Sequence, residues 1–434
     1  MEGLNMKFTA CGDAIIQRRI YEGYEGFDDI RDYIMKGDAR IFNFESTLNY
    51  EGECFASQFS GGTYVRTNPE MFGDCLKYGF NMTSFNNNHA MDFSYEGLLK
   101  TKDYIDEYDI PQCGVGRNLG EASAPCYLDT KSGRVALISV NSTFNPAMMA
   151  GEQSRRVIGR PGINGLRFNQ TIYVTKEQFD AVKNLGDSIG INVYNDIIRK
   201  EGYLKPLAEG TYEMDNLVFK VGEETKIVTE CNKEDLERIK KSIYEAKLQA
   251  DYIIITLHSH EISGTEKETP ADFIEEFAHF CIDNGANAVV GHGPHLLRPI
   301  EIYKKRPIFY SIGDFILQLY NIDFAPEDFF KKQGLNSDDT VHDLLRLRSA
   351  DFTRGLMIDK KMNETVIPYW ETDENGDLTY LELLPVELSM NGLKSHEGLP
   401  YIASDLSFID RLDKISRPYG TEVKMQGNVA VCKW

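Results

Sequence analysis

The sequence has no long hydrophobic run, no excess of positive charge and no paired-cysteine motif, and each absence excludes a class of protein. Its longest apolar runs, such as 252–257 and 286–290, are far shorter than the roughly 20 residues that a membrane helix needs. The segment 1–10 has neither the basic start nor the apolar stretch of a signal peptide. We therefore expect a cytoplasmic protein without a membrane partner.

Positive charge is scarce, because 47 Lys and Arg residues face 67 Asp and Glu residues, which leaves a net charge of −20. A field of this sign repels polyanions, so we expect no nucleic-acid partner. The 42% of apolar residues, with only 36 Gly and 15 Pro, are typical of a folded globular chain rather than a low-complexity one. A small-molecule or peptide substrate is the expected partner.

The eight cysteines are well separated and contain no C-x-x-C pair, which disfavours a zinc ribbon or a thioredoxin-type redox site. We interpret them as reduced and mostly half-buried thiols. They are Cys11, Cys54, Cys75, Cys113, Cys126, Cys231, Cys281 and Cys432.

Short β-rich runs alternate with amphipathic segments along most of the chain, a rhythm that predicts a layered α/β protein. The expected strands are 6–10, 40–44, 82–85, 134–140, 252–257, 288–290 and 308–310. Apolar residues at helical spacing predict helices over 69–78, 94–108 and 234–250. We expect one domain, 1–434, rather than three.

Two segments depart from this alternation. The first, 151–230, is expected to be an inserted subdomain or lid, and 351–434 a β-rich extension with a hairpin whose turn lies at 373–377. Residues 151–170 hold four arginines and one glutamate, a local net charge of +3 that would suit an anionic group of the substrate. The alternative is that these arginines pair with the chain's own carboxylates. They are Arg155, Arg156, Arg160 and Arg167.

Polar, metal-competent side chains directly follow several of the apolar runs. In α/β folds ligands bind at the carboxyl ends of strands, so these segments are predicted to converge on one site. They hold five of the eight histidines, and imidazole, carboxylate and amide ligands suit Mn, Zn or Fe in hydrolytic sites. Taken singly, Asp13 would also suit a helix N-cap and Asn88 an Asx turn. The segments are Cys11–Asp13, Asn43–Glu45, Asn86–His89, His258–Glu261 and Gly291–His295.

Six motifs follow one another in a fixed order over about residues 6–320. They are Gly-Asp (12–13), Asn-x-Glu (43–45), Asn-Asn-His-Ala-x-Asp (87–92), His-x-x-Glu (258–261), Gly-His-x-Pro-His (291–295) and Tyr-Ser-x-Gly-x-Phe (310–315). In this order the chain resembles the CapA, or poly-γ-glutamate capsule biosynthesis, family, which is similar in fold to calcineurin-like metallophosphoesterases. The resemblance implies a four-layer α/β/β/α sandwich, here with an inserted subdomain and a C-terminal β-hairpin extension.

The resemblance also implies a set of site residues. Glu45 stands where two metals share a bridging carboxylate, and His89 stands where a proton donor lies beside the reacting group. One or two Mn, Zn or Fe ions would polarise the scissile group and activate water. The implied metal ligands are Asp13, Glu45, Asn88, His258, His292 and His295.

Three positions depart from the patterns of these families. Ile15 stands where phosphoesterases have a His, Gly293 replaces the second His of Gly-His-His-Pro-His, and Asp314 stands where Asn is commoner. The first metal position is then short of a ligand. Two ions, one ion and no ion therefore all stay open.

Three functions are compatible with this pattern. The first is a metal-dependent hydrolase or amide-transfer enzyme acting on a peptide, γ-glutamyl or other small anionic substrate. The second is a metal-independent peptide epimerase that resembles CapA proteins and draws paired bases from His295, His260, Asp13 or Cys11. The third is a non-catalytic accessory factor in capsule polymer synthesis.

Overall fold

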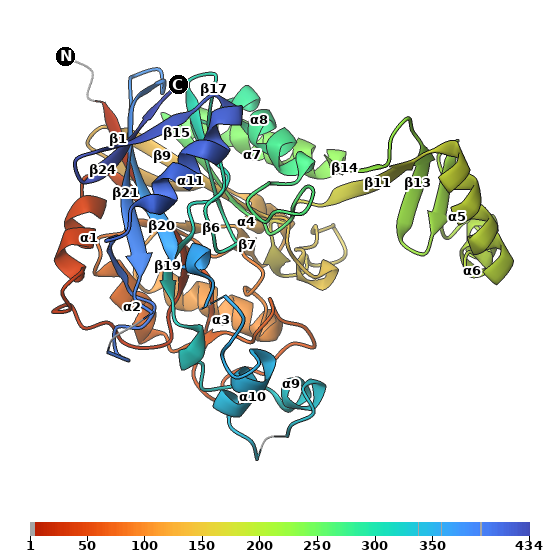
Figure 1. Cartoon of the computed structure of the whole chain (residues 1–434), viewed down its shortest axis with the longest axis horizontal. Coiled ribbons are helices and arrows are strands. Elements are labelled where there is room, and N and C mark those ends of the chain that lie inside the picture. Colours follow the sequence, from red (N-terminus) through yellow and green to blue (C-terminus); the bar gives the residue numbers. More distant parts are fainter. Residues whose placement is uncertain (1–4, 337, 357, 391–392) are drawn as a thin grey trace.

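The computed structural model describes residues 5–336, 338–356, 358–390 and 393–434, so the first four residues of the N-terminal segment lie outside it. Within these ranges the chain is a mixed α/β protein with several sheets, as predicted (Figure 1). The largest sheet has the order β23-β24-β21-β20-β1-β2-β5-β6, with β19 also beside β1 and β22 beside β21. Its strands are β1 (Met6–Ile15), β2 (Ala39–Phe44), β5 (Met82–Ser84), β6 (Gln112–Cys113), β19 (Asp314–Leu317), β20 (Glu364–Thr372), β21 (Leu378–Leu388), β22 (Pro400–Ile402), β23 (Glu422–Gln426) and β24 (Val429–Lys433).

The second large sheet has the order β17-β18-β16-β15-β9-β8. Its central strands β9, β15, β16 and β18 run parallel, and β15 is buried along its whole length. A parallel strand covered on both faces is expected to be continuously apolar, which is how the sequence of β15 reads. The strands are β8 (Cys126–Thr130), β9 (Gly133–Asn141), β15 (Tyr252–His258), β16 (Ala288–His292), β17 (Ile300–Tyr303) and β18 (Arg306–Phe309).

Three clusters of buried apolar side chains hold these elements together. One joins the two sheets and contains Phe8 of β1 and Ile254 of β15. A second packs the first sheet against α1 (Phe27–Ile34), α2 (Glu70–Leu76) and α3 (Ser94–Asp106). A third packs the second sheet against α7 (Lys233–Gln249) and α8 (Asp272–Asn284), and α11 (Ser407–Ser416) adds Phe408 to the cluster between the sheets.

The expected strands and helices agree closely with these elements. Each of the seven predicted strands overlaps one of β1, β2, β5, β9, β15, β16 and β18, and the predicted helices overlap α2, α3 and α7. The hairpin expected before Leu388 is confirmed as β20 and β21, and β20 lies antiparallel to β1 inside the largest sheet. All eight cysteines are unpaired, but six are fully buried rather than half-buried.

Residues 168–231 form a separate four-stranded sheet of order β12-β13-β11-β14, which projects from the two large sheets (Figure 1). Two helices, α5 and α6, accompany this sheet. None of the helices in the described ranges is long and apolar enough to cross a membrane. The elements are β11 (Phe168–Val174), α5 (Lys176–Ile189), α6 (Val193–Lys200), β12 (Thr211–Met214), β13 (Leu217–Val221) and β14 (Lys226–Cys231).

A smaller helical segment follows β19 and lies at the bottom of Figure 1. It contains α9 (Glu327–Lys332) and α10 (Val341–Arg348), whose aromatic and leucine side chains pack against Tyr64 and Phe93. This packing holds α10 beside the loop that precedes β4 (Arg66–Thr67).

Candidate metal centre

The predicted site residues converge where strands of the two sheets end. Asp13 lies in β1 between its neighbours Asn43 of β2 and Asp314 of β19, while His258 and His292 are paired at the ends of β15 and β16. Asp13 Oδ1 lies 3.7 Å from His258 Nδ1 and 3.5 Å from His292 Nδ1, so the ends of the two sheets meet.

Among the residues that the structure describes, three overlapping groups of side chains have the geometry to hold a metal ion. In each group the possible ligand atoms lie within 4.8 Å of one another. The structure therefore brings together the predicted residues Asp13, Glu45, His258, His260, His292 and His295 and adds Asp314. The groups are Asp13, His258 and His292; Glu45, His258 and His260; and Asp13, Glu45, His295 and Asp314.

Several ligand atoms of this cluster are buried without a hydrogen-bond partner among the described residues. Both carboxylate oxygens of Glu45, Nε2 of His292 and Oδ2 of Asp314 are in this condition. An unpaired buried carboxylate is costly unless a cation neutralises it. The donor set of carboxylate oxygens and imidazole nitrogens thus fits a divalent metal.

Burial dominates the pKa values in this cluster. It raises the pKa of Glu45 well above its usual range, with Asp13 and Asp314 adding to the shift, and it raises the pKa of Asp314 to about 6. Burial also acts to raise the pKa of Asp13, but the hydrogen bond to His258 and the charges of the surrounding histidines hold it below its usual range. In the absence of a cation the carboxylates repel one another. A bound divalent ion would outweigh this repulsion and lower their pKa values.

His292 gives the metal-free protein a pH-dependent stability. Burial lowers its pKa from 6.5 to about 4, so the unfolded chain takes up this proton first as the pH falls. The stability due to neutral His292 is present above pH 6.5 and is lost as the pH falls toward 4. Between pH 7.5 and 5.5 we expect the wild type to lose about 1.4 kcal/mol more than His292→Asn.

Urea unfolding of both chelator-treated proteins at the two pH values measures this difference. Equal losses in the wild type and the variant would show that His292 does not carry the effect.

Asn88 and His89 lie at the edge of the cluster. The Asn88 amide nitrogen donates to the Gly61 carbonyl at 2.9 Å, which leaves its Oδ1 buried and without a partner among the described residues. His89 Nδ1 lies 2.7 Å from Asp92 Oδ2, and its Nε2 lies 4.0 Å from Glu45 Oε1. Asp92 therefore fixes the ring so that Nε2 faces the cluster.

His295 is held in an uncommon backbone conformation. Its φ of 59° lies in the left-handed region, where residues other than glycine are infrequent. Its Nδ1 lies 2.8 Å from Asp314 Oδ1, and this contact fixes the ring. Burial acts to lower the pKa of His295, but the charge of Asp314, its hydrogen bond to the ring and the charge of Asp13 together outweigh burial, and the pKa is raised.

The departures from the family patterns have visible structural reasons. Ile15 packs in an apolar cluster with Val65 and Leu317. Gly293 has a φ of 115°, a Cβ there would approach the Ser259 nitrogen to 2.9 Å, and its N–H donates to Asp13 Oδ2 at 2.8 Å. A His at position 293 would thus be strained, and a His at position 15 would bury a polar ring among apolar side chains.

Cys11, one of the bases considered for an epimerase, does not suit that role. It packs in the apolar cluster between the first sheet and its helices, and burial raises the pKa of its thiol well above the usual range. A thiol in such surroundings is inert.

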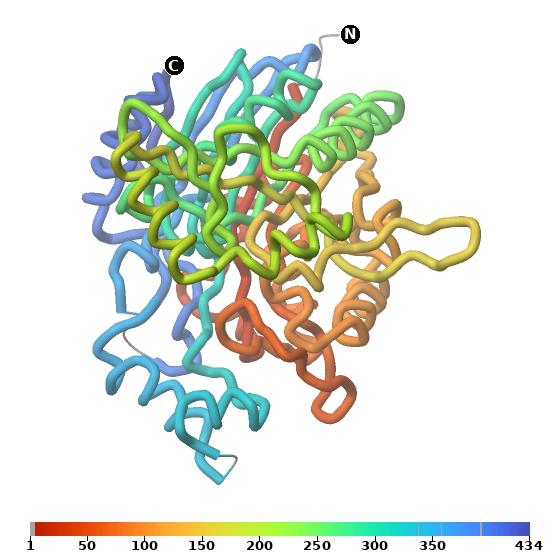
Figure 2. Tube along the Cα trace, turned by 90° about the vertical axis from the view of Figure 1, so that its right-hand side faces the viewer, coloured from red at the N-terminus to blue at the C-terminus, as the bar shows by residue number. Residues whose placement is uncertain are grey.

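The four predicted arginines are not gathered into one clamp. Arg155 and Arg156 are exposed on a loop that projects from the body (yellow in Figure 2). Arg160 Nε donates to the Met149 carbonyl at 3.2 Å, and Arg167 Nε donates to Asp235 Oδ2 at 2.9 Å. Ion pairing within the chain, the alternative considered for these residues, is what the structure shows for Arg167.

Arg167→Ala is therefore expected to act on stability. Asp235 is fully buried, and the substitution removes the side-chain bonds of one of its two arginine partners, while Arg238 stays at 2.6 Å. Because Arg167 is half-exposed and Arg238 remains, we expect a loss of about 1–2 kcal/mol in urea unfolding. Arg155→Ala is the matched control, without an expected loss. A loss of bound metal in Arg167→Ala would contradict this structural role.

Sequence reasoning missed Arg298, a fully buried arginine. Its guanidinium donates to the carbonyls of Lys267 at 3.0 Å and Glu261 at 2.9 Å, and so holds the loop that carries His260. Arg298 follows His295 by three residues, and nothing in the local pattern distinguishes it from an exposed arginine.

Comparisons with known proteins relate this chain to one bacterial family. A family model described as "Bacterial capsule synthesis protein PGA_cap" matches residues 7–319. The uncharacterised protein y4sH of Sinorhizobium fredii is 30% identical over all of this chain and 94% of its own length. Capsule biosynthesis protein CapA of Bacillus anthracis is 22% identical over 73% of this chain and 60% of its own. Among solved structures, a putative 5'-nucleotidase from Staphylococcus aureus covers 93% of this chain and 55% of its own, at 11% identity and a TM-score of 0.37.

Proposed function

The chain belongs to the bacterial capsule synthesis protein family PGA_cap, as its motifs predict, and we propose that it is a metal-dependent hydrolase or amide-transfer enzyme. The observation that carries this proposal is the buried cluster in which, among the described residues, both oxygens of Glu45 lack hydrogen-bond partners beside several imidazoles. Such a cluster is costly to fold unless it binds a cation.

The proposed metal ligands are those of the buried cluster. The chemistry of His258 limits how many ions they can hold. A neutral imidazole has one lone pair, and His258 directs Nδ1 toward Asp13 and Nε2 toward Glu45. His258 therefore serves a single ion, and a second ion would rely on the group that contains Asp314. We propose Mn, Zn or Fe, held by Asp13, Glu45, Asn88, His258, His292, His295, His260 and Asp314.

His89 is the proposed proton donor. When bound, the metal would polarise the scissile group and lower the pKa of its water toward 7. Asp92 holds the Nδ1 side of the His89 ring, which leaves Nε2 free to give a proton to the leaving group. His260, whose pKa burial lowers well below its usual range, stays neutral, so its one lone pair can serve either the ion or, where the other residues hold the ion, a proton.

The proposed substrate is a peptide, γ-glutamyl or other small anionic molecule. Relatives of this chain are named capsule biosynthesis protein CapA and, in Mycobacterium tuberculosis, probable polyglutamine synthesis accessory protein. These names concern capsule and polyglutamine synthesis, and the second favours amide chemistry over phosphate esters.

We also propose the domain layout that the resemblance implies. The two sheets with helices on their outer faces would form a metallophosphatase-like four-layer sandwich, into which residues 151–230 are inserted. Residues 351–434 would be the C-terminal extension, whose hairpin completes the largest sheet.

A metal-independent peptide epimerase is the second candidate. It is favoured by the packing that disfavours a His at positions 15 and 293, and by the rings of His260 and His295, whose centroids lie 5.5 Å apart. Solvent deuterium entering a peptide α-carbon without cleavage would support this candidate, and retention of the original hydrogen would oppose it.

Elemental analysis combined with an activity screen tests the proposal. The purified protein is assayed on phosphate esters, γ-glutamyl peptides and short α-peptides, before and after chelation. We expect bound Mn, Zn or Fe and turnover of peptides that chelation abolishes. Activity that survives complete metal removal would reject the proposed function.

A further inference from the structure

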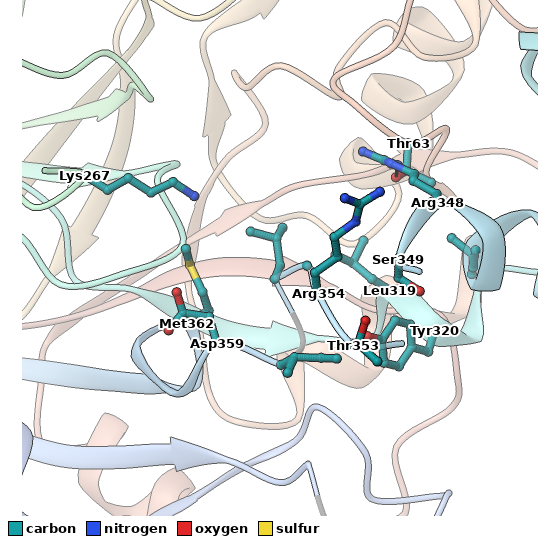
Figure 3. A pocket seen from close by; sticks show the side chains of 14 residues that line it. Thr63, Lys267, Leu319, Tyr320, Arg348, Ser349, Thr353, Arg354, Asp359 and Met362 are labelled. Atoms are coloured by element: carbon teal, nitrogen blue, oxygen red, sulfur yellow. Dashed lines mark hydrogen bonds between the residues drawn. The ribbon is translucent and has the colours of Figure 1, made fainter. Parts of the chain in front are cut away.

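A pocket of about 620 Å³ lies between α10, the residues after β19 and the loop at Thr63 (Figure 3). Its walls combine apolar side chains, such as Leu319, Leu345 and Met362, with three cations. The cations are Lys267, Arg348 and Arg354. A pocket of this size and mixed lining suits a small ligand with an apolar part and a charged part.

The three cations are unusual in so acidic a chain because they have no carboxylate partner among the described residues. In the parts of the chain that the structure describes, none of them forms an ion pair within 4.0 Å. Arg348 donates to the Thr63 hydroxyl and lies over the Phe329 ring. The one carboxylate in the lining, Asp359, accepts from the Lys361 backbone N–H at 3.0 Å.

Three separate segments connect the pocket to the metal centre. Leu319 and Tyr320 follow the strand that begins at Asp314. Lys267 belongs to the loop of His260, and Arg298 bonds the carbonyls of both residues.

The third segment is the loop that ends at Thr63. A Cβ at Gly61 would approach both Asn88 Nδ2 and the His89 ring to 2.8 Å, so this loop lies directly against the proposed proton donor. The Thr63 hydroxyl, two residues on, holds Arg348 in the pocket wall. One short loop thus lies against His89 at Gly61 and lines the pocket at Thr63.

We infer that this pocket binds a carboxylate of the substrate through Lys267, Arg348 and Arg354 and positions the adjoining chain at the metal centre. The inference rests on the proposed function for the identity of the reacting centre. Guanidinium groups pair carboxylates bidentately, and the apolar walls suit the methylene groups of a glutamyl chain. This places the anion-binding role in the pocket rather than in the loop of Arg155 and Arg156.

Calorimetric binding of tri-γ-glutamate to the full chain tests the inference. We expect Arg354→Gln and Lys267→Gln each to weaken binding about ten- to hundredfold, because each removes a charge-assisted contact. Neither side chain forms a hydrogen bond or an ion pair within the described residues, so folding should be preserved. Arg346→Gln is the matched control, since Arg346 lies on α10 and pairs with Asp343.

The outcomes separate this inference from the proposed function. Unchanged affinity in both pocket variants, loss of affinity in an Arg155→Gln/Arg156→Gln double variant instead, or no binding to the wild type would overturn the inference. Inorganic phosphate binding with the same variant dependence would also overturn it in favour of a phosphate pocket. Loss of peptide binding in the pocket variants of a protein that holds no metal would support the pocket while rejecting the metal-dependent reaction.

Discussion

Replacing Asp13 by Asn is expected to remove the stabilisation that a divalent ion gives to this protein. Asp13 belongs to two of the three metal-capable groups, and its Oδ1 lies close to both His258 and His292. At a thousandfold excess over its dissociation constant, a bound ion adds about 4 kcal/mol to the free energy of unfolding. The neutral amide of Asn removes the charge that attracts the ion.

Urea unfolding of chelator-treated protein, with and without added Mn²⁺ or Zn²⁺, measures this increment, and elemental analysis measures bound metal. Asp235→Asn is the matched control, because Asp235 is equally buried but pairs with Arg167 and Arg238 outside the cluster. It should lower the stability and leave the metal-dependent increment intact. An undiminished increment in Asp13→Asn would show that the ion binds elsewhere.

The strands and the convergence of the site follow from local sequence patterns. Parallel strands that are buried on both faces have nearly continuous apolar sequences, as in β15 and β16. Because such strands share a direction, their carboxyl ends gather the residues that follow them. His258 and His292 are therefore predictable as neighbours although 34 residues separate them.

Other parts of the site depend on pairings that no local pattern encodes. Asp314 becomes a candidate ligand because β19 lies beside β1, which brings together segments some 300 residues apart in the sequence. Arg167, predicted to bind substrate, instead pairs with Asp235, which lies 68 residues later in the sequence. The local charge along the sequence predicted the loop 151–170 as the site for an anion. Whether a cation is unpaired depends on its neighbours in space, which the sequence does not give.

Replacing His89 by Gln is expected to lower kcat about 10²- to 10⁴-fold without loss of bound metal. Its Nε2 faces Glu45 Oε1 at 4.0 Å, while Nδ1 is held by Asp92 at 2.7 Å. Gln keeps hydrogen-bonding atoms in the same place but does not transfer a proton near neutral pH. The measurement is steady-state turnover of the peptide found in the screen, together with elemental analysis.

A second His–carboxylate pair in the chain supplies the control for this prediction. His279 Nε2 lies 2.9 Å from Glu301 and its ring stacks on Tyr303, at the interface of α8 and the second sheet. His279→Gln removes a comparable pair and should leave kcat unchanged. The kcat of Asp92→Asn should lie between those of His89→Gln and His279→Gln, because His89 remains but its ring is less firmly oriented. Equal turnover in wild type and His89→Gln, with metal retained, would remove His89 from the reaction and leave His260 or His295 as the proton donor.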